Sequence, residues 1–177
     1  MHVALLQLNV SDDPVANLAE TLVQMRAAAK GGAGFVLTPE VTNCLSSSRT
    51  RQQQVLQLQH DDMTLAAMRA EAQALGVWVL IGSLALKTGD ADGRFANRSF
   101  LVAPDGQIAG WYDKIHMFDV QVNDVETYCE SAGYRPGSHA TVVDMGDATL
   151  GMSICYDIRF PHLYRALAQN GAKILTA

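Results

Sequence analysis

The sequence predicts an α/β fold, a layered sandwich of sheets and helices, and three observations lead to this prediction. Short apolar runs alternate with stretches in which apolar residues recur at helical spacing, as in successive βα units. Turn signals separate other apolar runs by only a few residues, which indicates antiparallel hairpins. No internal repeat, low-complexity tract or linker interrupts residues 1–177, so we expect one domain.

The first half of the chain alternates strands with helices. Three apolar runs are predicted as strands: residues 2–8, 34–37 and 76–85. The helices between them begin at Pro14, after the start signal of Asp13, and at about Asp62. Gly31 and Gly76 mark where these two helices end.

The second half is richer in hairpins. The strand over residues 76–85 and the next two apolar runs are separated by the turn signals at 88–93 and 105–106, which predicts an antiparallel meander. Residues 118–137 are predicted as a long acidic loop over the sheet edge. Two strands within residues 140–155, a helix over 161–169 and a strand over 173–177 complete the chain.

Composition excludes several classes of protein. A net charge of −5 without any basic run disfavours nucleic-acid and membrane-surface partners. No apolar window reaches membrane-spanning length and no secretory leader is evident, so we expect a cytoplasmic protein. The three cysteines, Cys44, Cys129 and Cys155, lack metal-ligand and disulfide spacing, and the five histidines are scattered, so we expect neither metal nor cofactor.

Cys155 is the candidate nucleophile. It lies in GMSICYDIRFP (residues 151–161), where an apolar strand gives way to a helix. A thiol at such a turn is presented at the end of a sheet, and the first N–H groups of a following helix favour a thiolate. The alternative is an inert buried cysteine, which is the commoner case for a cysteine taken alone.

Two charged residues at strand ends complete a catalytic set. Glu40 ends the run over residues 34–37, and Lys114 follows the run over 107–111; each alone is as well explained as a solvated strand end. A thiol with a pKa of about 8.5 needs a base, for which Glu40 is the candidate. Lys114, with the backbone N–H of Tyr156, would stabilise the oxyanion formed on an amide or nitrile carbon.

These motifs resemble those of the carbon–nitrogen hydrolases, the nitrilase superfamily. The resemblance rests on LTPE (37–40), YDKIHMFD (112–119) and GMSICYDIRFP (151–161). It implies the catalytic glutamate, lysine and cysteine roles for Glu40, Lys114 and Cys155. It also implies an α-β-β-α sandwich whose subunits pair as homo-oligomers, acting on a small-molecule amide substrate.

Two further candidate site residues are Glu130, which the resemblance implies, and Arg159, which its guanidinium chemistry suggests. Glu130, in YCES (128–131), is similar to the family's second glutamate beside the lysine, although it could be a loop carboxylate. The residues after Cys155 resemble the branch that hydrolyses ω-amides of small dicarboxylic acids or deaminated glutathione. Arg159 could pair there with a substrate carboxylate, or with a neighbouring acid such as Asp157.

The resemblance covers only the front part of the family domain. We therefore expect an incomplete sandwich, from a chain that is truncated or completed by another chain. This leaves a non-catalytic binding or assembly module as the alternative function. A serine hydrolase is a weaker alternative, because Ser153 begins a partial G-x-S-x-G pattern without evident histidine and aspartate partners.

Overall fold

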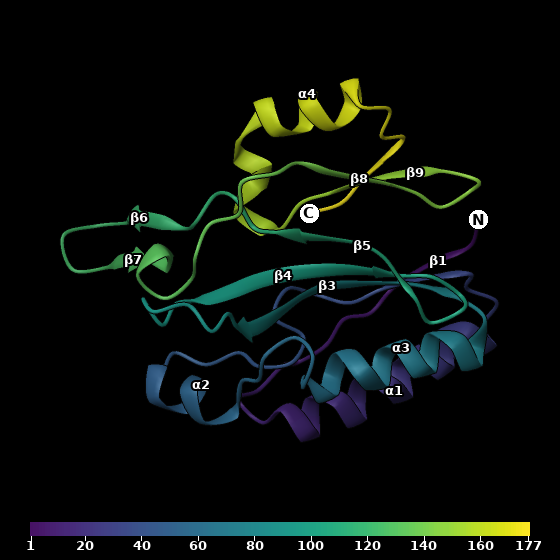
Figure 1. Ribbon diagram of the computed structural model, residues 1–177, viewed down its shortest axis with the longest axis horizontal. Helices are drawn as coiled ribbons and strands as arrows, with labels where there is room; N and C mark the ends of the chain where they lie inside the picture. Colours follow the sequence, from purple (N-terminus) through teal and green to yellow (C-terminus); the bar gives the residue numbers. More distant parts are fainter.

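Two sheets face each other in the computed structural model, which describes residues 1–177, and helices cover their outer faces (Figure 1). The five-stranded sheet has the order β1 (Val3–Leu5), β2 (Phe35–Leu37), β3 (Trp78–Lys87), β4 (Phe95–Val102) and β5 (Ile108–Asp113). Strands β1, β2 and β3 pair in parallel, whereas β3, β4 and β5 form the predicted antiparallel meander.

The second sheet has three strands. Its order is β10 (Ile174–Leu175), β9 (Thr149–Met152) and β8 (Thr141–Asp144), with β10 parallel and β8 antiparallel to β9. Beyond the sheets, β6 (Asp119–Gln121) and β7 (Thr127–Cys129) pair as a separate hairpin. This hairpin corrects the prediction of an irregular loop over residues 118–137, because its exposed, polar strands carry no apolar alternation.

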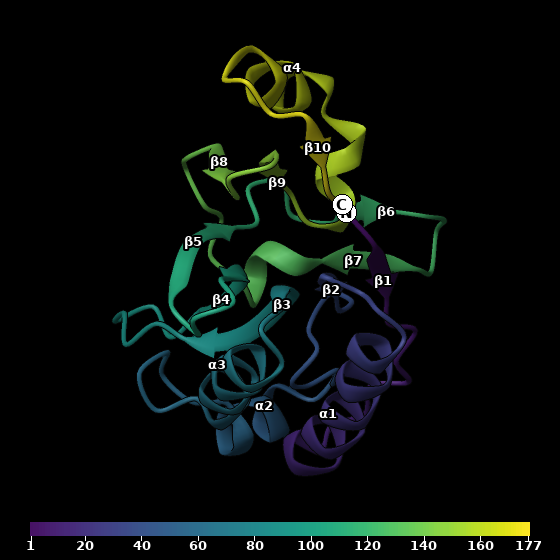
Figure 2. The same ribbon diagram turned by 90° about the vertical axis from the view of Figure 1, so that its right-hand side faces the viewer.

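Helices form the outer layers. Helices α1 (Pro14–Lys30) and α3 (Met63–Leu75) lie side by side against the five-stranded sheet, while α4 (Pro161–Gln169) covers the three-stranded sheet (Figure 2). The predicted α-β-β-α layering is confirmed. A fourth helix, α2 (Arg49–Val55), was not predicted, because its sequence RTRQQQV has no apolar periodicity.

Helix boundaries follow the predicted cap residues. The side chain of Asp13 accepts the N–H groups of Val15 and Ala16 at the start of α1. Asp62 caps α3, and Gly76 ends α3 with a left-handed φ of 65°. No helix has the length and apolar character needed to cross a bilayer.

Two hydrophobic cores hold the four layers together. The larger lies between α1, α3 and the five-stranded sheet and includes Met25, Met68, Val79 and Phe100, all fully buried. The second fills the space between the two sheets and reaches α4 through Leu163 and Leu167. Because β3 is covered on both faces, its sequence is a nearly continuous apolar run, whereas β4 has Asn97, Arg98 and Ser99 at its centre.

Candidate active site

Glu40 lies in a turn directly after β2, and this turn is fastened to β3. The N–H of Gly82 donates to Thr38 Oγ1 (3.1 Å), and the N–H of Val41 donates to Ser83 Oγ (2.8 Å). A Cβ on Gly82 would lie 2.1 Å from the carbonyl oxygen of Thr38, so the approach of the two backbones requires glycine. The turn therefore has one fixed position at the carboxyl end of β2.

Lys114 follows β5 and is only 2% exposed. Its Nζ lies 2.9 Å from Glu40 Oε1, and 3.0 and 2.9 Å from Glu130 Oε1 and Oε2. Burial by itself would lower the pKa of Lys114, but the two carboxylates outweigh burial and raise that pKa. Lys114 is therefore a permanent ammonium whose N–H donors all point at carboxylate oxygens.

Glu130 begins a short 3₁₀ segment, η1 (Glu130–Ala132), directly after β7. Its Oε2 accepts the N–H of Phe118 (2.6 Å), and its carbonyl accepts the N–H groups of Gly133 and Tyr134. The β6–β7 hairpin thus leads the chain away from Lys114 and returns it, so that Glu130 meets the ammonium.

Cys155 stands at the junction of β9 and the 3₁₀ segment η2 (Cys155–Arg159) with a φ of 48°. Val41, next to Glu40, also has a φ of 48°, and these are the only two non-glycine residues with positive φ. Side chains with a Cβ rarely adopt this conformation, and strain of this kind concentrates at functional sites. Both strained residues line one cavity.

The Cys155 thiol is protonated at rest. Loss of hydration inside the cavity, and then the charge of Glu40, raise the pKa of Cys155 to about 11, against the opposing charge of Lys114. The prediction that a helix start favours a thiolate is therefore wrong. The segment after Cys155 is a five-residue 3₁₀ turn, and loss of hydration together with the charge of Glu40 keeps the thiol neutral.

Asp157 connects the nucleophile to the end of β5. Its fully buried carboxylate accepts the N–H of Ile154 (3.0 Å), the N–H of His116 (3.0 Å) and the hydroxyl of Tyr112 (2.7 Å), and it lies 2.7 Å from His116 Nδ1. One side chain thereby fixes both the backbone before Cys155 and the backbone after Lys114. The sequence analysis missed this role, because its partners are distant in sequence.

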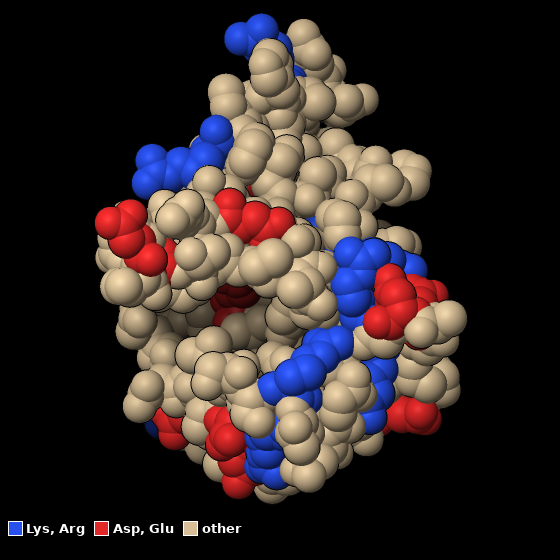
Figure 3. All heavy atoms as spheres, turned by 90° about the vertical axis from the view of Figure 1, so that its left-hand side faces the viewer, with Lys and Arg blue, Asp and Glu red and all other residues tan.

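These residues surround a cavity of about 890 Å³. Its wall combines the turn after β2, the start of α2, the β6–β7 hairpin and the nucleophile turn. Figure 3 shows this face of the molecule, with a hollow whose floor carries acidic side chains. The lining residues with catalytic or binding chemistry are Glu40, Arg49, Asn97, Lys114, Glu130, Tyr134 and Cys155. The structure thus brings the four predicted catalytic residues into one cavity.

Comparison with known proteins agrees with this arrangement. The family model described as carbon–nitrogen hydrolase matches residues 2–177. The chain belongs to the carbon–nitrogen hydrolase family. Deaminated glutathione amidase of Yersinia enterocolitica is 37% identical over 177 residues, which are 99% of this chain and 61% of that protein. The chloroplastic omega-amidase of Arabidopsis thaliana is 30% identical over 98% of this chain and 47% of its own length.

A solved structure supports the same fold. The NitFhit protein of C. elegans superposes with a TM-score of 0.89 at 25% sequence identity, over 98% of this chain and 42% of that chain. This carbon–nitrogen hydrolase chain therefore spans about three fifths of the length of the Yersinia relative.

Two predicted substrate-binding residues lie outside the cavity lining. Tyr156 packs edge-on against the rings of Phe118 and Phe160, and its backbone N–H donates to no acceptor in the chain. Arg159 is exposed and forms no ion pair. The alternative pairing of Arg159 with Asp157 is wrong, because that carboxylate is occupied by His116 and Tyr112.

Asn97 is a site residue that the sequence did not indicate. It is 2% exposed on β4, and its Nδ2 donates to Glu40 Oε1 (2.7 Å) and lies 3.4 Å from Glu130 Oε1. The backbone carbonyl of Asn97 also accepts the backbone N–H of Lys114. Asn97 therefore orients both carboxylates from the sheet beneath them. Only the pairing of β4 with β5, which brings Asn97 next to Lys114, could have indicated this role from the sequence.

Ser153 has no contact suited to a nucleophile. It is 4% exposed, and its hydroxyl lies 2.6 Å from the hydroxyl of Tyr164 and donates to the carbonyl of Thr176. These contacts fasten the three-stranded sheet to α4. The structure has no group of three or more His, Cys, Asp or Glu side chains placed to hold a metal ion.

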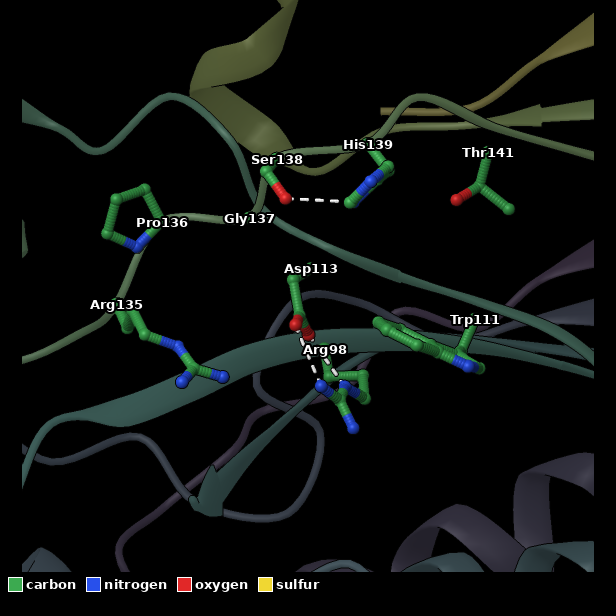
Figure 4. Close-up of a pocket in the computed structure, with 9 residues that line it drawn as sticks. All are labelled: Arg98, Trp111, Asp113, Arg135, Pro136, Gly137, Ser138, His139 and Thr141. Carbon is green, nitrogen blue, oxygen red and sulfur yellow. Dashed lines mark hydrogen bonds and ion pairs between the residues drawn. The ribbon is translucent and has the colours of Figure 1, made fainter. Parts of the chain in front are cut away.

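A second cavity, of about 660 Å³, lies beside β5 (Figure 4). Arg98 binds Asp113 through Nε and Nη2 at 2.6 and 2.7 Å, and its guanidinium stacks 4.1 Å from the ring of Trp111. Arg135 is paired with Asp90. Both arginine side chains that line this second cavity therefore already form ion pairs with carboxylates of the chain.

Proposed function

We propose that this protein hydrolyses a non-peptide carbon–nitrogen bond, the amide of a small ω-amido acid or of deaminated glutathione, with release of ammonia. The observation that supports this best is the shared cavity of Cys155, Glu40, Lys114 and Glu130, in which one buried ammonium touches both carboxylates. The similarity to a deaminated glutathione amidase and an omega-amidase supports the amide substrate class.

Attack begins from a neutral thiol. Glu40 takes the proton of Cys155 as sulfur bonds to the amide carbon, and the carbonyl electrons move onto oxygen. In this proposal Lys114 stabilises the oxyanion, and the backbone N–H of Tyr156, which donates to no acceptor in the chain, is the second candidate donor. Protonation of Glu40 also weakens its bond to Lys114, which frees an ammonium N–H at the moment when the oxyanion forms.

The charge of the site stays constant through this step. Before attack, two carboxylates and one ammonium leave one net negative charge. During attack, Glu40 becomes neutral while the substrate oxygen becomes negative, so the net charge is unchanged. Glu130 stays beside Lys114 throughout as a positioning residue, and the transition state adds no net charge to the site.

Collapse of the intermediate completes the reaction. The carbonyl reforms as the carbon–nitrogen bond breaks, and Glu40 donates its proton to the departing nitrogen, which leaves as ammonia. The product is a thioester on Cys155. Glu40 then removes a proton from water, whose oxygen attacks the thioester; the acid leaves and the thiol is restored.

A direct assay tests this function. The pure chain is incubated with glutaramate and the ammonia is measured, beside Cys155→Ala and the matched variant Cys129→Ala, whose thiol also lines the cavity. We expect ammonia from the wild-type chain and from Cys129→Ala, and none from Cys155→Ala. Ammonia from all three proteins would reject Cys155 as nucleophile, and ammonia from none would favour the binding module.

We also propose a cytoplasmic location and pairing with a second copy of the chain. Three free cysteines, of which Cys129 and Cys155 are exposed and Cys44 is buried, support a reducing compartment. The exposed apolar side chains of Ile158 and Leu175 support pairing through the side of the molecule that carries α4. Light scattering on the purified chain tests the pairing, and a monomer mass at micromolar concentration would exclude it.

A further inference from the structure

Arg49 is the only guanidinium that lines the cavity of the proposed catalytic residues. It begins α2, and its Nη1 and Nη2 donate to the carbonyls of Gly133 (3.0 Å) and Gly93. The guanidinium also stacks 3.6 Å from the centroid of the Phe95 ring. Three contacts therefore hold its plane in one orientation before any ligand arrives.

No carboxylate of the chain neutralises Arg49. The arginines at positions 26, 51, 94, 98 and 135 each have an acidic partner, whereas Arg49 has carbonyl partners only. A guanidinium carries five N–H donors, and Arg49 directs two of them to carbonyls. It therefore keeps donors and an uncompensated charge on the cavity wall.

Charge in the cavity makes this arginine necessary for an anionic substrate. Glu40 and Glu130 together outnumber Lys114 by one charge, and Lys114 has no donor to spare. An amide that carries a carboxylate would be repelled by the glutamates unless another cation bound it. Arg49 is the one group in the lining that meets this need.

Arg49 and the proposed catalytic residues share one lining. Arg49 binds the carbonyl of Gly133, which lies three residues beyond Glu130 across η1. Gly133, Glu130, Lys114 and Cys155 all line the same cavity as Arg49, so one bound ligand can meet the guanidinium and the catalytic groups together.

The hydroxyl of Tyr134 supplies a second donor beside Arg49. It accepts a hydrogen bond from Gln52 Nε2 (3.2 Å) and donates to no acceptor in the chain. Burial raises the pKa of Tyr134, so this hydroxyl keeps its proton. A guanidinium and a phenol with free hydrogens thus line the same wall as Gly133.

We infer that Arg49, assisted by Tyr134, binds the carboxylate of an amide substrate that carries one, and so determines the preference for ω-amido acids over neutral amides. This inference rests on the proposed function and names a specificity residue for it. It assigns the carboxylate to Arg49 instead of Arg159, whose side chain is exposed outside the cavity lining.

The test compares one charged and one neutral amide of similar length, glutaramate and pentanamide. Arg49→Met removes the guanidinium, and Arg49→Lys keeps the charge without the planar fork. Arg51→Met is the matched control, because Arg51 lies on the same helix and contacts Asp12 outside the cavity. The readout is the ratio of kcat/KM for glutaramate to that for pentanamide.

We expect Arg49→Met to lower this ratio about 10- to 100-fold, mainly through the KM of glutaramate. Arg49→Lys should lower it less, and Arg51→Met should leave it within about twofold of the wild type. An equal loss on both amides would mean that Arg49 only holds α2 in place, and the inference would be wrong. Far-ultraviolet circular dichroism shows whether each variant is folded.

A binding measurement separates this inference from the proposed function. Calorimetry with the Cys155→Ala chain compares glutaramate with pentanamide, with and without Arg49→Met. Preferential binding of glutaramate that depends on Arg49 supports the inference even if the wild-type chain releases no ammonia, an outcome that rejects only the proposed hydrolysis. Binding of glutaramate no tighter than that of pentanamide rejects the inference.

Discussion

The two cavities contain similar residue types but distribute charge differently. In the cavity beside β5, Arg98 and Asp113 form a one-to-one pair with both bonds near 2.7 Å, and no residue has a strained φ. In the cavity of Cys155, two carboxylates share Lys114, and a guanidinium has no carboxylate. Paired charges stabilise a structure, whereas unmatched charges beside strained backbone are features of a site that acts on a ligand.

The largest effect is expected from Lys114→Met, which leaves two carboxylates facing each other around a buried apolar side chain. We expect the free energy of unfolding to fall by about 3–5 kcal/mol, as when one partner of a buried ion pair is removed. Ammonia release should fall to the level of Cys155→Ala. Urea unfolding followed by tryptophan fluorescence measures the first quantity; a loss smaller than that of Arg98→Met would contradict the comparison of the two cavities.

Glu40→Gln should change the alkylation rate of Cys155 and the turnover of substrate in opposite directions. Loss of the base is expected to lower kcat about 10²- to 10⁴-fold. Because Glu40 contributes to raising the pKa of Cys155 to about 11, the same substitution should lower that pKa and speed alkylation by iodoacetamide at pH 8. Glu130→Gln is the control and should shift the alkylation profile less. A slower alkylation in Glu40→Gln would refute the assigned electrostatics.

The raised thiol pKa also predicts the direction of a stability change with pH. The folded chain keeps the Cys155 proton to a higher pH than the unfolded chain does, so this group stabilises the fold below the ordinary thiol pKa. That contribution is lost as pH rises toward about 11. Cys155→Ala should therefore flatten the decline of the unfolding free energy over this alkaline range. Urea titrations at successive pH values measure it, and parallel declines in both proteins would exclude the linkage.

Asp157→Asn tests whether the nucleophile turn depends on one carboxylate. Replacing an ionised acceptor that is bound by Tyr112, His116 and Ile154 should cost about 1.5–3 kcal/mol of unfolding free energy. Burial and then Asp157 raise the pKa of Tyr112, so the variant should titrate Tyr112 at lower pH, as measured by tyrosinate absorbance. The same titration of Tyr112→Phe shows which part of the absorbance change comes from Tyr112. Unchanged titration would show that Asp157 does not control that hydroxyl.

The smallest effect is expected in the other cavity. Arg98→Met breaks a pair whose members are 18% and 12% exposed, and should cost about 1–2 kcal/mol of unfolding free energy. Because neither residue lines the cavity of Cys155, the kcat of the folded fraction should stay within about twofold of the wild type. Urea unfolding and the ammonia assay check both values. A kcat loss as large as that of Glu40→Gln would erase the distinction between the cavities.

Sequence reasoning succeeded where a local signal decided the structure. Asp13 and Asp62 start their helices and Gly76 ends one, because caps act within a single turn. The meeting of Glu40 and Cys155 at one cavity was predicted because each follows an apolar strand, and strand ends of stacked sheets can lie close together. In these cases, the residues that determine the local structure are neighbours in the sequence.

Prediction from the sequence failed where a local structure depends on residues far away in the chain. The polar helix α2 forms without an apolar stripe, capped by Ser48 and anchored by contacts of Arg49 with residues 93 and 133. Two partners of Asp157, Tyr112 and His116, lie more than forty residues earlier, and only they show that it connects the two sheets. The neutral state of the Cys155 thiol was not predicted for the same reason, because burial in the cavity and the charge of Glu40, which is distant in sequence, raise its pKa.

The links from Asp157 also imply an order of assembly. Tyr112 and His116 precede it by 45 and 41 residues, and they lie at the end of one sheet, while Asp157 follows the central strand of the other. The conformation of the nucleophile turn therefore waits for the two sheets to stack, since long-range contacts form late in folding. On refolding, native thiol chemistry should return with the slowest tertiary phase, after the secondary structure has recovered.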